Sequence, residues 1–563
     1  GHTGINLCQT FRNFRLKPIG LACDLRKYYN SIEVHEDSYP INRIVFRDNA
    51  DPSGTLREYV LKNLFYGIKP AGSITDEALK FVAREAVHHC SECINKAIPN
   101  NHEEEARDSA TNEREPGKEE VHIQKIDDRI YNPECSAVNH EFYRLLERKY
   151  VDDILGSTFT SKRVEEIKQF TESKLSEYSF STKGWNVSGD ERTPGTNNLN
   201  DDNKLGTCSY LWDPHTDRFK PKEVLLHNGI RFRGAIKPMK DWVRTSGTGQ
   251  LVSIKAPALR TRVFKDVNEI TPDALNELWK DTPRTLRSGL SKTYQLFEPC
   301  GFLAPLAGQT RAALHEAVKL NGNNMEREIP EHLWHHLIKC ITEMLKAMTF
   351  EFDRRPDKEQ ITKECENILI TFTDYSLNMS IVSYLVTITT TGKPSVIILQ
   401  ARTLNRRFTV PKGELDGMKE GSIQHKTLVT ELGNILSRDY LLTDSMICIY
   451  QLINDKEHEN PFVQNRVQEI RQNIDVINKV YHVVSAENMA DLGTRYGTST
   501  NDANFITCEA VAPHSTYARG RYWFSDLGEA EDIGIITSAK TLYNEKKKNQ
   551  ESADVQEPTV TTC

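Results

Sequence analysis

The sequence predicts a multidomain α+β protein. Its 563 residues are enough for several domains, and 38% of them are hydrophobic, which is normal for packed globular protein. Short apolar stretches that favour strands occur among longer stretches that favour helices. Two of the predicted strands, residues 19–23 and 368–373, are each followed at once by an aspartate, Asp24 and Asp374.

Three folded stretches are expected along the chain. The first mixes apolar strands with helical segments, and the second has strand-like "EVLLHNGIRFRGAI" followed by helical "EHLWHHLIKCITEMLKAM". The third begins with the strand "NILITFTDYS" and continues with alternating strands around a Gly-Lys-Pro turn. The predicted boundaries are 1–195, 196–365 and 366–500, followed by a partly disordered extension over 501–563.

A long polar insertion interrupts the first stretch. Residues 100–120, "NNHEEEARDSATNEREPGKEE", are acidic and lack apolar periodicity, so they cannot bury enough apolar surface to offset the entropy of ordering. We expect disorder over residues 98–130. The tail "NEKKKNQESADVQEPTVTTC" has the same character and predicts the same outcome.

Charge and hydropathy restrict the class of protein. The formal net charge of −7 counts against a simple electrostatic nucleic-acid binder but agrees with an enzyme that has a local basic groove. No run of eighteen apolar residues occurs, so no membrane span is expected. Twelve cysteines without a regular pattern favour a reducing, cytoplasmic compartment over a disulfide framework. The chain begins with Gly1, so we expect a piece of a longer open reading frame.

One tight cluster of metal-ligating residue types occurs, "HHCSEC", with His88, His89, Cys90 and Cys93. A structural zinc site needs about four ligands, usually supplied as two pairs. No second pair with suitable spacing is visible in the sequence. A helix with ordinary buried thiols is therefore favoured over zinc.

The segment "RKYVDDILGS" places Asp152 and Asp153 side by side between apolar residues. Adjacent aspartates are most often surface-turn residues, because Asp caps nearby backbone amides. Here Tyr150 and Ile154 flank a pair with apolar neighbours on both sides, which predicts the bend of a short hairpin with strand-like arms. Two carboxylates held in that way form a natural site for magnesium.

Asp24 offers a third carboxylate. It ends the apolar strand of residues 19–23, where a lone aspartate is usually a cap or a turn residue. If that strand lies beside the hairpin, Asp24 meets Asp152 and Asp153. Three carboxylates on adjacent strands suit two divalent ions, which can activate an attacking hydroxyl and stabilise the leaving oxygen in phosphoryl transfer.

Together, "ACDLRKYYNSIEV" and "YVDD" resemble the palm of a reverse transcriptase, in the form found in Pol polyproteins of Bel/Pao-type LTR retrotransposons. "LFYGIKPAGSITDEAL" resembles the family's template-positioning segment, "FSTKGWNVSGD" its later lysine motif, and "LGTCSYLWDPHTDRF" its primer-grip segment. "SKTYQLFEPCGFLAPLAGQTRAAL" resembles the connecting region after the thumb. The resemblance covers roughly residues 5–500.

The resemblance implies roles for single residues. The metal ions of polymerisation would be held by Asp24, Asp152 and Asp153. Tyr29 falls on the family's aromatic gate against the ribose 2′-hydroxyl, and Lys183 falls near the incoming triphosphate. The residues alone favour a core tyrosine and a solvated lysine at these two positions. With Gly67 near the template–dNTP pocket, the implied substrate-binding residues are Tyr29, Gly67, Tyr150 and Lys183.

The sequence departs from the family pattern in two places. "KPAGS" at 69–73 stands where a Ser-Pro pair is commoner, and a long acidic insertion precedes "YVDD". The fingers strands that supply basic residues for the triphosphate lie upstream in the family. We expect them to be largely missing from this chain, which would limit polymerisation.

The third stretch contains four acids in the order Asp374, Glu414, Asp444 and Asp491. Each acid alone, at a strand end or a helix start, is mostly a cap. Their strand–helix–strand–helix order is more specific and resembles the Asp-Glu-Asp-Asp site of ribonuclease H, and "TDS" and "NMADLGTR" resemble the Bel/Pao ribonuclease H segment. The resemblance implies two magnesium ions that activate water against the RNA strand of an RNA–DNA hybrid.

An aspartic peptidase is a competing interpretation, because retroelement polyproteins contain one. That chemistry needs two Asp-Ser/Thr-Gly turns that share a proton. "TDYS" and "TDSM" lack the glycine, and no such turn occurs in the chain. No paired His/Cys zinc motif of an integrase follows the third stretch either.

The resemblance as a whole implies a retroelement Pol fragment with RNA-directed DNA polymerase and ribonuclease H activities. The alternative is a catalytically degenerate or repurposed retroelement-derived protein that binds nucleic acid. The implied cofactors are two Mg²⁺ ions per active site, with Mn²⁺ as the alternative ion. The implied partners are an RNA template, a DNA primer, RNA–DNA hybrid, dNTPs and the protease and integrase parts of Pol, inside a cytoplasmic virus-like particle. The implied domains are a reverse transcriptase palm over 1–195, a thumb with the primer grip over 196–300, a helical connection over 301–365 and a mixed-sheet ribonuclease H-like α/β domain over 366–500.

Overall fold

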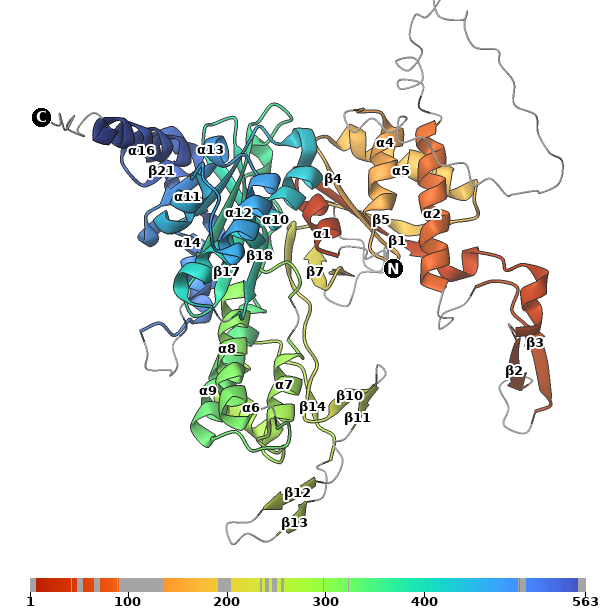
Figure 1. Cartoon of the computed structure of the whole chain (residues 1–563). Helices are drawn as coiled ribbons and strands as arrows, with labels where there is room; N and C mark the ends of the chain where they lie inside the picture. The colour runs from red at the N-terminus through yellow and green to blue at the C-terminus, as the bar shows by residue number, and fades with distance from the viewer. Residues whose placement is uncertain are drawn as a thin grey trace, which may run out of the picture. The chain divides into compact units, whose positions relative to one another are not determined.

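The computed structural model divides the chain into two compact units, each of which mixes helices and strands (Figure 1). Unit 1 comprises residues 1–15 and 19–198, and unit 2 comprises residues 16–18 and 199–563. No helix among the described residues has the length and apolar character that a membrane crossing requires. The structure describes all residues except 1–6, 42, 48–53, 65–70, 89, 91–134, 191–203, 233–234, 238–241, 246–250, 255–257, 297, 323, 407, 495, 497–502 and 555–563.

Unit 1 is built on a three-stranded antiparallel sheet in the order β4-β1-β5. The central strand β1 is apolar up to Asp24 because it is buried within the unit. Helices α2, α4 and α5 contact one another, and their apolar residues Leu79 and Phe142 share a core cluster with Leu21 and Leu25 of β1 (Figure 1). The elements of unit 1 are α1 (Leu7–Arg15), β1 (Ile19–Arg26), η1 (Tyr29–Ser31), η2 (Glu36–Ile41), β2 (Arg43–Arg47), β3 (Leu56–Val60), α2 (Ala71–His88), α4 (Val138–Glu147), β4 (Asp153–Thr158), α5 (Ser161–Ser176) and β5 (Ser181–Val187).

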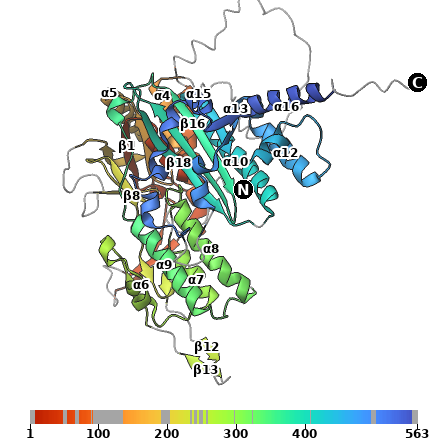
Figure 2. The same ribbon diagram turned by 90° about the vertical axis from the view of Figure 1, so that its left-hand side faces the viewer.

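The first part of unit 2 contains a four-stranded sheet, β15-β8-β7-β6, several short strand pairs and a group of helices. Phe219, Phe302 and Phe352 pack together, with ring centroids 5.3–5.8 Å apart. Helices α8 and α9 contact each other along their length in both views (Figure 1, Figure 2). The elements are β6 (Leu205–Thr207), β7 (Tyr210–Asp213), β8 (Arg218–Pro221), β9 (Leu226–His227), β10 (Ile230–Phe232), β11 (Ala235–Lys237), β12 (Trp242–Thr245), β13 (Leu251–Ile254), β14 (Thr261–Arg262), η4 (Val267–Glu269), α6 (Pro272–Trp279), α7 (Leu286–Thr293), α8 (Ala304–Asn321), α9 (Glu331–Ala347), β15 (Phe352–Asp353) and η5 (Lys358–Gln360).

The rest of unit 2 is organised by a six-stranded mixed sheet, β18-β17-β16-β19-β20-β21. Strands β16, β17 and β18 are antiparallel, β19 and β20 run parallel to β16, and β21 is antiparallel to β20. These strands are apolar on both faces because both faces are covered: α10 packs next to Thr373, and Phe524 stacks on Phe372 at 5.5 Å. The elements are β16 (Asn367–Tyr375), β17 (Met379–Ile388), β18 (Pro394–Leu404), α10 (Val410–Leu432), η6 (Gly433–Ile435), β19 (Arg438–Thr443), α11 (Met446–Leu452), α12 (Pro461–Asn473), α13 (Val476–Lys479), β20 (Val480–Val483), η7 (Ser485–Glu487), η8 (Asp491–Gly493), η9 (Cys508–Val511), α14 (Thr516–Arg519), η10 (Tyr522–Ser525), α15 (Leu527–Asp532), β21 (Ile536–Ser538) and α16 (Ala539–Asp554).

The observed architecture differs from the predicted domain plan at the C-terminal end. The mixed sheet continues past residue 500, because its last strand is β21. Helix α16 extends to Asp554, through most of the tail that we expected to be disordered, since Leu542 anchors it in a core cluster with Val476 and Val480. Unit 2 also holds the predicted thumb, connection and ribonuclease H-like stretches in one compact unit. The predicted disordered insertion over 98–130 falls entirely outside the described residues.

Candidate active sites

The first group of carboxylates lies where β1 and β4 pair in unit 1. The two strands are antiparallel, and their register places Asp24 directly opposite Asp153. The backbone N–H of Leu25 donates a hydrogen bond of 3.0 Å to the carbonyl of Asp152. The charge of the Asp152 carboxylate also acts on Asp24. The structure therefore brings the three predicted metal-binding aspartates of the palm together at one end of the sheet.

Tyr150 closes the turn that carries the aspartate pair. Its backbone N–H and carbonyl both form hydrogen bonds with Asp153, each 2.9 Å long. Within the turn Val151 has a φ of 55°, a strained conformation for a β-branched residue. The predicted hairpin has only one strand-like arm, because α4 continues to Glu147 and leaves a single bridging residue on that side.

Lys183, on β5, partly compensates the negative charge. Its Nζ lies 2.7 Å from Asp24 Oδ2. Burial raises the pKa of Asp24 above its ordinary value, the hydrogen bond from Lys183 opposes that rise, and the charge of Asp152 adds to it. Asp24 Oδ1 is buried, and no donor among the described residues reaches it. The site thus gathers more negative charge than its one lysine offsets.

Tyr29 lies on η1, the turn that follows β1. Its ring packs against Tyr28, with centroids 4.9 Å apart, and it is partly buried against the core cluster of unit 1. Its hydroxyl lies 3.9 Å from the point where a Cβ on Gly72 would stand, so it reaches the first turn of α2. Gly67, the other predicted substrate-binding residue of this region, lies outside the described residues.

The second group of carboxylates lies at the carboxyl ends of two parallel strands in unit 2. Strands β16 and β19 pair in parallel with Thr373 beside Thr443, so the next residues of the two strands lie next to each other. Helix α10 contributes a glutamate near its start, and η8 begins with an aspartate. The four acids that meet in this way are Asp374, Glu414, Asp444 and Asp491.

Asp374 is the most buried of these acids, with 8% of its surface exposed. Burial is the main reason that its pKa is raised to about 7, and the negative charges of Asp444 and Asp491 add to the rise. The hydroxyl of Thr494 donates a hydrogen bond to Asp374 Oδ2 and opposes it. The carboxylates are therefore close enough to repel one another strongly.

The carboxyl of Glu414 is also affected by burial and by a neighbouring negative charge. Burial raises the pKa of its carboxyl, and the charge of Asp444 raises it further. The hydroxyl of Ser445 donates a 2.6 Å hydrogen bond to Glu414 Oε2 and opposes the rise. The charge of Asp444 thus acts on acids from two other segments, Asp374 and Glu414.

Asn488 and Thr494 position this site, although the sequence did not mark them as functional residues. The Asn488 side chain donates to the carbonyl of Thr373 and accepts from the N–H of Ala490, each at 3.1 Å. It therefore ties the turn before Asp491 to the strand that carries Asp374. Both residues belong to "NMADLGTR", and that motif was the only sequence signal for them.

His482 is a further neighbour that no sequence pattern distinguished. It lies on β20, paired with Thr443 of β19, and interacts with the backbone and charge of Asp444. Burial lowers the pKa of its imidazole below 6.5, and Asp444 opposes that change. His482 therefore lies beside Asp444, and burial makes its imidazole harder to protonate.

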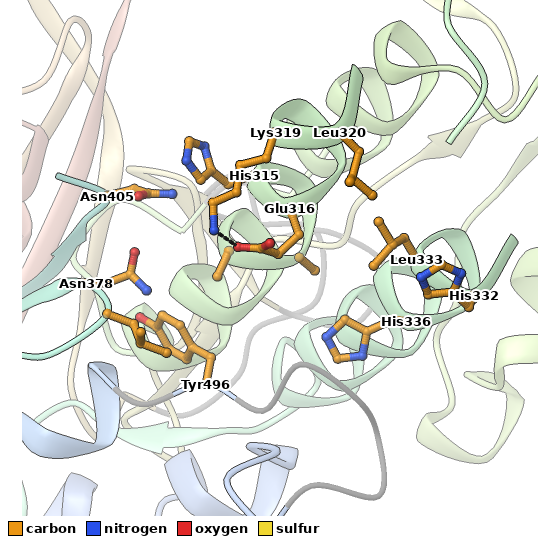
Figure 3. Close-up of a pocket in the computed structure, with 13 residues that line it drawn as sticks. His315, Glu316, Lys319, Leu320, His332, Leu333, His336, Asn378, Asn405 and Tyr496 are labelled. Atoms are coloured by element: carbon orange, nitrogen blue, oxygen red, sulfur yellow. Dashed lines mark hydrogen bonds and ion pairs between the residues drawn. The ribbon is translucent and has the colours of Figure 1, made fainter. Parts of the chain in front are cut away.

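A separate hollow lies between α8, α9 and the turn from β16 to β17 (Figure 3). None of the four acids lines it. Lys319 and Glu316, which both line it, form an ion pair within α8. Other residues that line it include His315, Leu320, His332, Leu333, His336, Asn378, Asn405 and Tyr496.

Comparison with known families gives one match. Residues 285–445 match the model of the Pao retrotransposon-like RNaseH-like domain. The matched range includes Asp374, Glu414 and Asp444 and ends before Asp491. No curated protein matches the sequence.

Solved structures that align with this chain include a viral reverse transcriptase. The foamy viral protease-reverse transcriptase in complex with RNA/DNA hybrid aligns over 89% of this chain and 48% of its own, with 11% identity and a TM-score of 0.41. The foamy viral protease-reverse transcriptase dRH in complex with ds DNA aligns over 86% and 60%, with 12% identity and a TM-score of 0.42. RNase H1 from the halophilic archaeon Halobacterium salinarum NRC-1 aligns over 22% and 90%, with 15% identity and a TM-score of 0.17.

This chain therefore spans 48% and 60% of the two foamy viral chains with which it aligns. The family match lies within unit 2 and includes the elements of the mixed sheet from β16 to β19, with three of the four acids. It confirms the predicted resemblance to Pol polyproteins of Bel/Pao-type retrotransposons, and the chain carries a Pao retrotransposon-like, RNaseH-like domain.

Proposed function

We propose that the RNaseH-like domain of unit 2 cleaves the RNA strand of RNA–DNA hybrids with divalent metal ions. The observation that carries the proposal is the meeting of four acids from four segments at the carboxyl ends of β16 and β19. A structural cap would need one acid beside backbone amides, whereas here the acids act on one another. The proposed ligands are Asp374, Glu414, Asp444 and Asp491.

The donor set fits magnesium. Carboxylate oxygens are the ligands that this ion prefers, and Mn²⁺ accepts the same set. The negative charges of Asp444 and Asp491 add to the burial that raises the pKa of Asp374 to about 7, and a bound cation would offset them. When bound, two such ions activate the attacking water and stabilise the leaving oxygen of the RNA strand.

The chain's own residues orient the carboxylates. Thr494 bonds to Asp374, and Ser445 bonds to Glu414, so two acids from different elements each keep one oxygen fixed. Asp444 and Asp491 are only half-buried, which leaves the group open to a substrate from solvent. Selection of RNA over DNA would rest on contacts to the 2′-hydroxyl.

The test is a cleavage assay of the whole chain on an end-labelled RNA–DNA hybrid, with and without Mg²⁺. Cleavage of the RNA strand should require the ion and disappear in Asp444→Asn. Asp455→Asn is the matched control, because Asp455 is exposed and accepts its hydrogen bond from the Tyr543 hydroxyl, at 3.3 Å. Cleavage that persists in Asp444→Asn overturns the assignment. Hybrid binding without cleavage by the unaltered chain favours the alternative, a repurposed nucleic-acid-binding protein.

We also infer that unit 1 is the palm of an RNA-directed DNA polymerase. This second function is supported by the register that sets Asp24 opposite Asp153, with Asp152 in the same turn and Lys183 bonded to Asp24. The three aspartates would hold the ions, and Lys183 would turn from Asp24 toward the triphosphate. Tyr29 would face the ribose of the incoming dNTP.

Primer extension on an RNA template, with the chain extended upstream to restore the fingers strands, tests this inference. Incorporation of labelled dNTP should require Mg²⁺ and be lost in Asp153→Asn. It should be kept in Glu177→Gln, a change at an exposed acid that pairs with Lys174. Tyr29→Val should admit ribonucleotides. Incorporation that survives Asp153→Asn would exclude these aspartates from the reaction.

A further inference from the structure

Two thiols and one imidazole come together at the junction of α2 and α4 in unit 1. Cys90 follows α2, and its N–H donates to the carbonyl of Val87 at 3.0 Å. Cys135 lies just before α4, and His140 stands in the first turn of that helix. All three are buried, with exposed fractions of 2% for Cys90, 7% for Cys135 and 0% for His140.

The spacing of their donor atoms suits one tetrahedral ion. One ligand atom from each residue lies within 4.8 Å of the other two, and the two sulfurs are 3.8 Å apart. Two thiolates about 2.3 Å from one tetrahedral zinc ion stand roughly 3.8 Å from each other. Sulfurs joined in a disulfide are only about 2.05 Å apart. The geometry therefore resembles a metal site more closely than a crosslink.

The scaffold holds these donors in place without a ligand. Asn139 Nδ2 donates to the carbonyl of Ala86 at 2.8 Å and joins the start of α4 to the end of α2. At the opposite end of the helix pair, the buried ion pair of Lys149 with Asp76 joins the segment after α4 to the start of α2. The two helices are thus an antiparallel pair that is tied at both ends.

We propose that Cys90, Cys135 and His140 bind a structural zinc ion. Thiolate and imidazole ligands favour zinc and disfavour magnesium or calcium, which take oxygen donors. Each thiol loses its proton on binding, while the imidazole binds through a neutral nitrogen. The fourth position of the tetrahedron is left to a further donor. The sequence near "HHCSEC" contains no second pair of zinc ligands. The fold instead brings Cys135, 45 residues further along the chain, and His140 to Cys90.

Zinc at this position would close a long loop. Cys90 and Cys135 stand at the two ends of the polar segment 91–134, so one ion would fix both ends of that segment. Because the site exists only in the folded chain, the binding free energy of the ion would stabilise the folded state. The ion would also anchor α4, the helix that leads to the turn at Asp152 and Asp153, and so support the palm geometry.

Metal analysis of the whole chain, purified under reducing conditions, tests the proposal. We expect about one zinc ion per chain, the stoichiometry of a single tetrahedral site. Cys90→Ser, Cys135→Ser and His140→Asn should each lose most of it. Cys340→Ser is the matched control, because Cys340 is a buried thiol 3.7 Å from His336 on α9 and no second thiol is grouped with it among the described residues. That variant should keep its zinc.

A spectroscopic readout covers the case in which a serine variant fails to fold. Cobalt exchanged into the unaltered chain should show thiolate-to-metal charge transfer and the visible bands of a tetrahedral site. Cys135→His should still bind one cobalt ion, with weaker charge transfer because one thiolate is gone. Chelation of the zinc should lower the melting temperature and expose additional reactive thiols. A chain without zinc, a Cys90–Cys135 disulfide in the native protein, or unchanged cobalt spectra in Cys135→His would each overturn the proposal.

Discussion

At the scale of single residues, a substitution of Asp444 distinguishes a metal-binding acid from a structural cap. Its charge raises the pKa of both Asp374 and Glu414, so without metal it costs folding free energy. Asp444→Asn should therefore leave the metal-free protein as stable as before or slightly more stable. The same change should remove the rise in melting temperature that Mg²⁺ produces by binding only the folded site. Calorimetry with EDTA and then with Mg²⁺ measures both effects.

Asp475 is the control, because it is a structural cap and its loss should lower stability without affecting cleavage. It caps α13 by accepting a hydrogen bond from the N–H of Asn478. Asp475→Ala should cost about 1 kcal/mol of stability and leave hybrid cleavage unchanged. A marked loss of metal-free stability in Asp444→Asn would show instead that Asp444 is structural.

The burial of Lys292 predicts that the stability of the folded protein depends on pH, independently of the metal sites. It is 1% exposed, its Nζ donates to the carbonyl of His227 at 2.9 Å, and it lies 5.3 Å from the ring centre of Trp279. Burial lowers the pKa of this amine to about 7. The unfolded chain, with an amine pKa near 10.4, binds the proton more strongly, so stability should rise as the pH increases from about 7 to about 10.

The comparison with Lys292→Met isolates this effect. The variant removes the titrating amine and keeps a long apolar chain in the same space. Urea unfolding at several pH values should show the wild type gaining stability relative to the variant between pH 7 and pH 10. A constant difference across that range would mean that Lys292 keeps its ordinary pKa in the folded protein.

Helix α10 shows how an element positions a site. Gly413, Gly417 and Gly421 recur every four residues and face the sheet beside Asp374. A Cβ on Gly413 would stand 2.1 Å from the ring of Tyr375, and one on Gly421 would stand 2.2 Å from Thr373 Cγ2. The absence of side chains at these two positions lets the helix approach the strand closely enough to bring Glu414 to the other acids.

This contact predicts opposite outcomes for two identical substitutions. Gly421→Ala should destabilise the protein by about 1–3 kcal/mol, because overpacking against β16 outweighs the better helix propensity of alanine. Gly417→Ala meets its nearest atoms at an ordinary 3.8 Å, so it should be neutral or gain up to about 1 kcal/mol. Thermal unfolding compares the two variants. Equal effects would show that α10 is not packed closely on β16.

The turn at Asp152 differs from the structure that its neighbouring residues predicted. Apolar residues on both sides of the aspartate pair predicted two strand-like arms. One side is instead the end of α4, because Leu145 and Leu146 are buried in the helical layer. A single bridge at Tyr150 then holds the turn, and Val151 takes a strained backbone conformation. Tertiary packing of the helix outweighed the local strand preference.

At the scale of the whole molecule, the C-terminal residues complete the RNaseH-like domain. Phe524 stacks on Phe372, the Tyr384 hydroxyl donates to the carbonyl of Tyr517 at 2.8 Å, and β21 pairs with β20. A chain that ends at residue 500 would expose this apolar face and a strand edge. We therefore expect that truncation to lower the melting temperature strongly and to promote aggregation.

Truncation after Asp554 is the matched control, since it keeps β21 and α16. This shorter chain should melt at the same temperature as the full one and should retain hybrid cleavage. Differential scanning calorimetry and sedimentation compare the three chains. An unchanged melting temperature for the chain that ends at residue 500 would mean that the mixed sheet is stable without its last strand.

Local patterns in the sequence determined much of what surrounds the candidate sites. The apolar runs before Asp24 and Asp374 predicted strands there, and β1 and β16 include both residues. The order of the four acids predicted a ribonuclease H-like arrangement, and the family match agrees with that fold. These features could be predicted because strand periodicity and motif spacing are properties of neighbouring residues. The roles of the acids remain predictions that the cleavage and extension assays test.

Only the tertiary structure decided the contacts between distant segments. Cys135 and His140 join Cys90 because α2 and α4 pack as an antiparallel pair, and no spacing in the sequence reveals that pairing. Likewise β21 completes a sheet whose other strands end far earlier in the chain, and Thr494 reaches Asp374 across 120 residues. Such contacts depend on which surfaces bury one another in the folded chain. That choice is made by the free energy of the whole packed unit and is not encoded in any short stretch of residues.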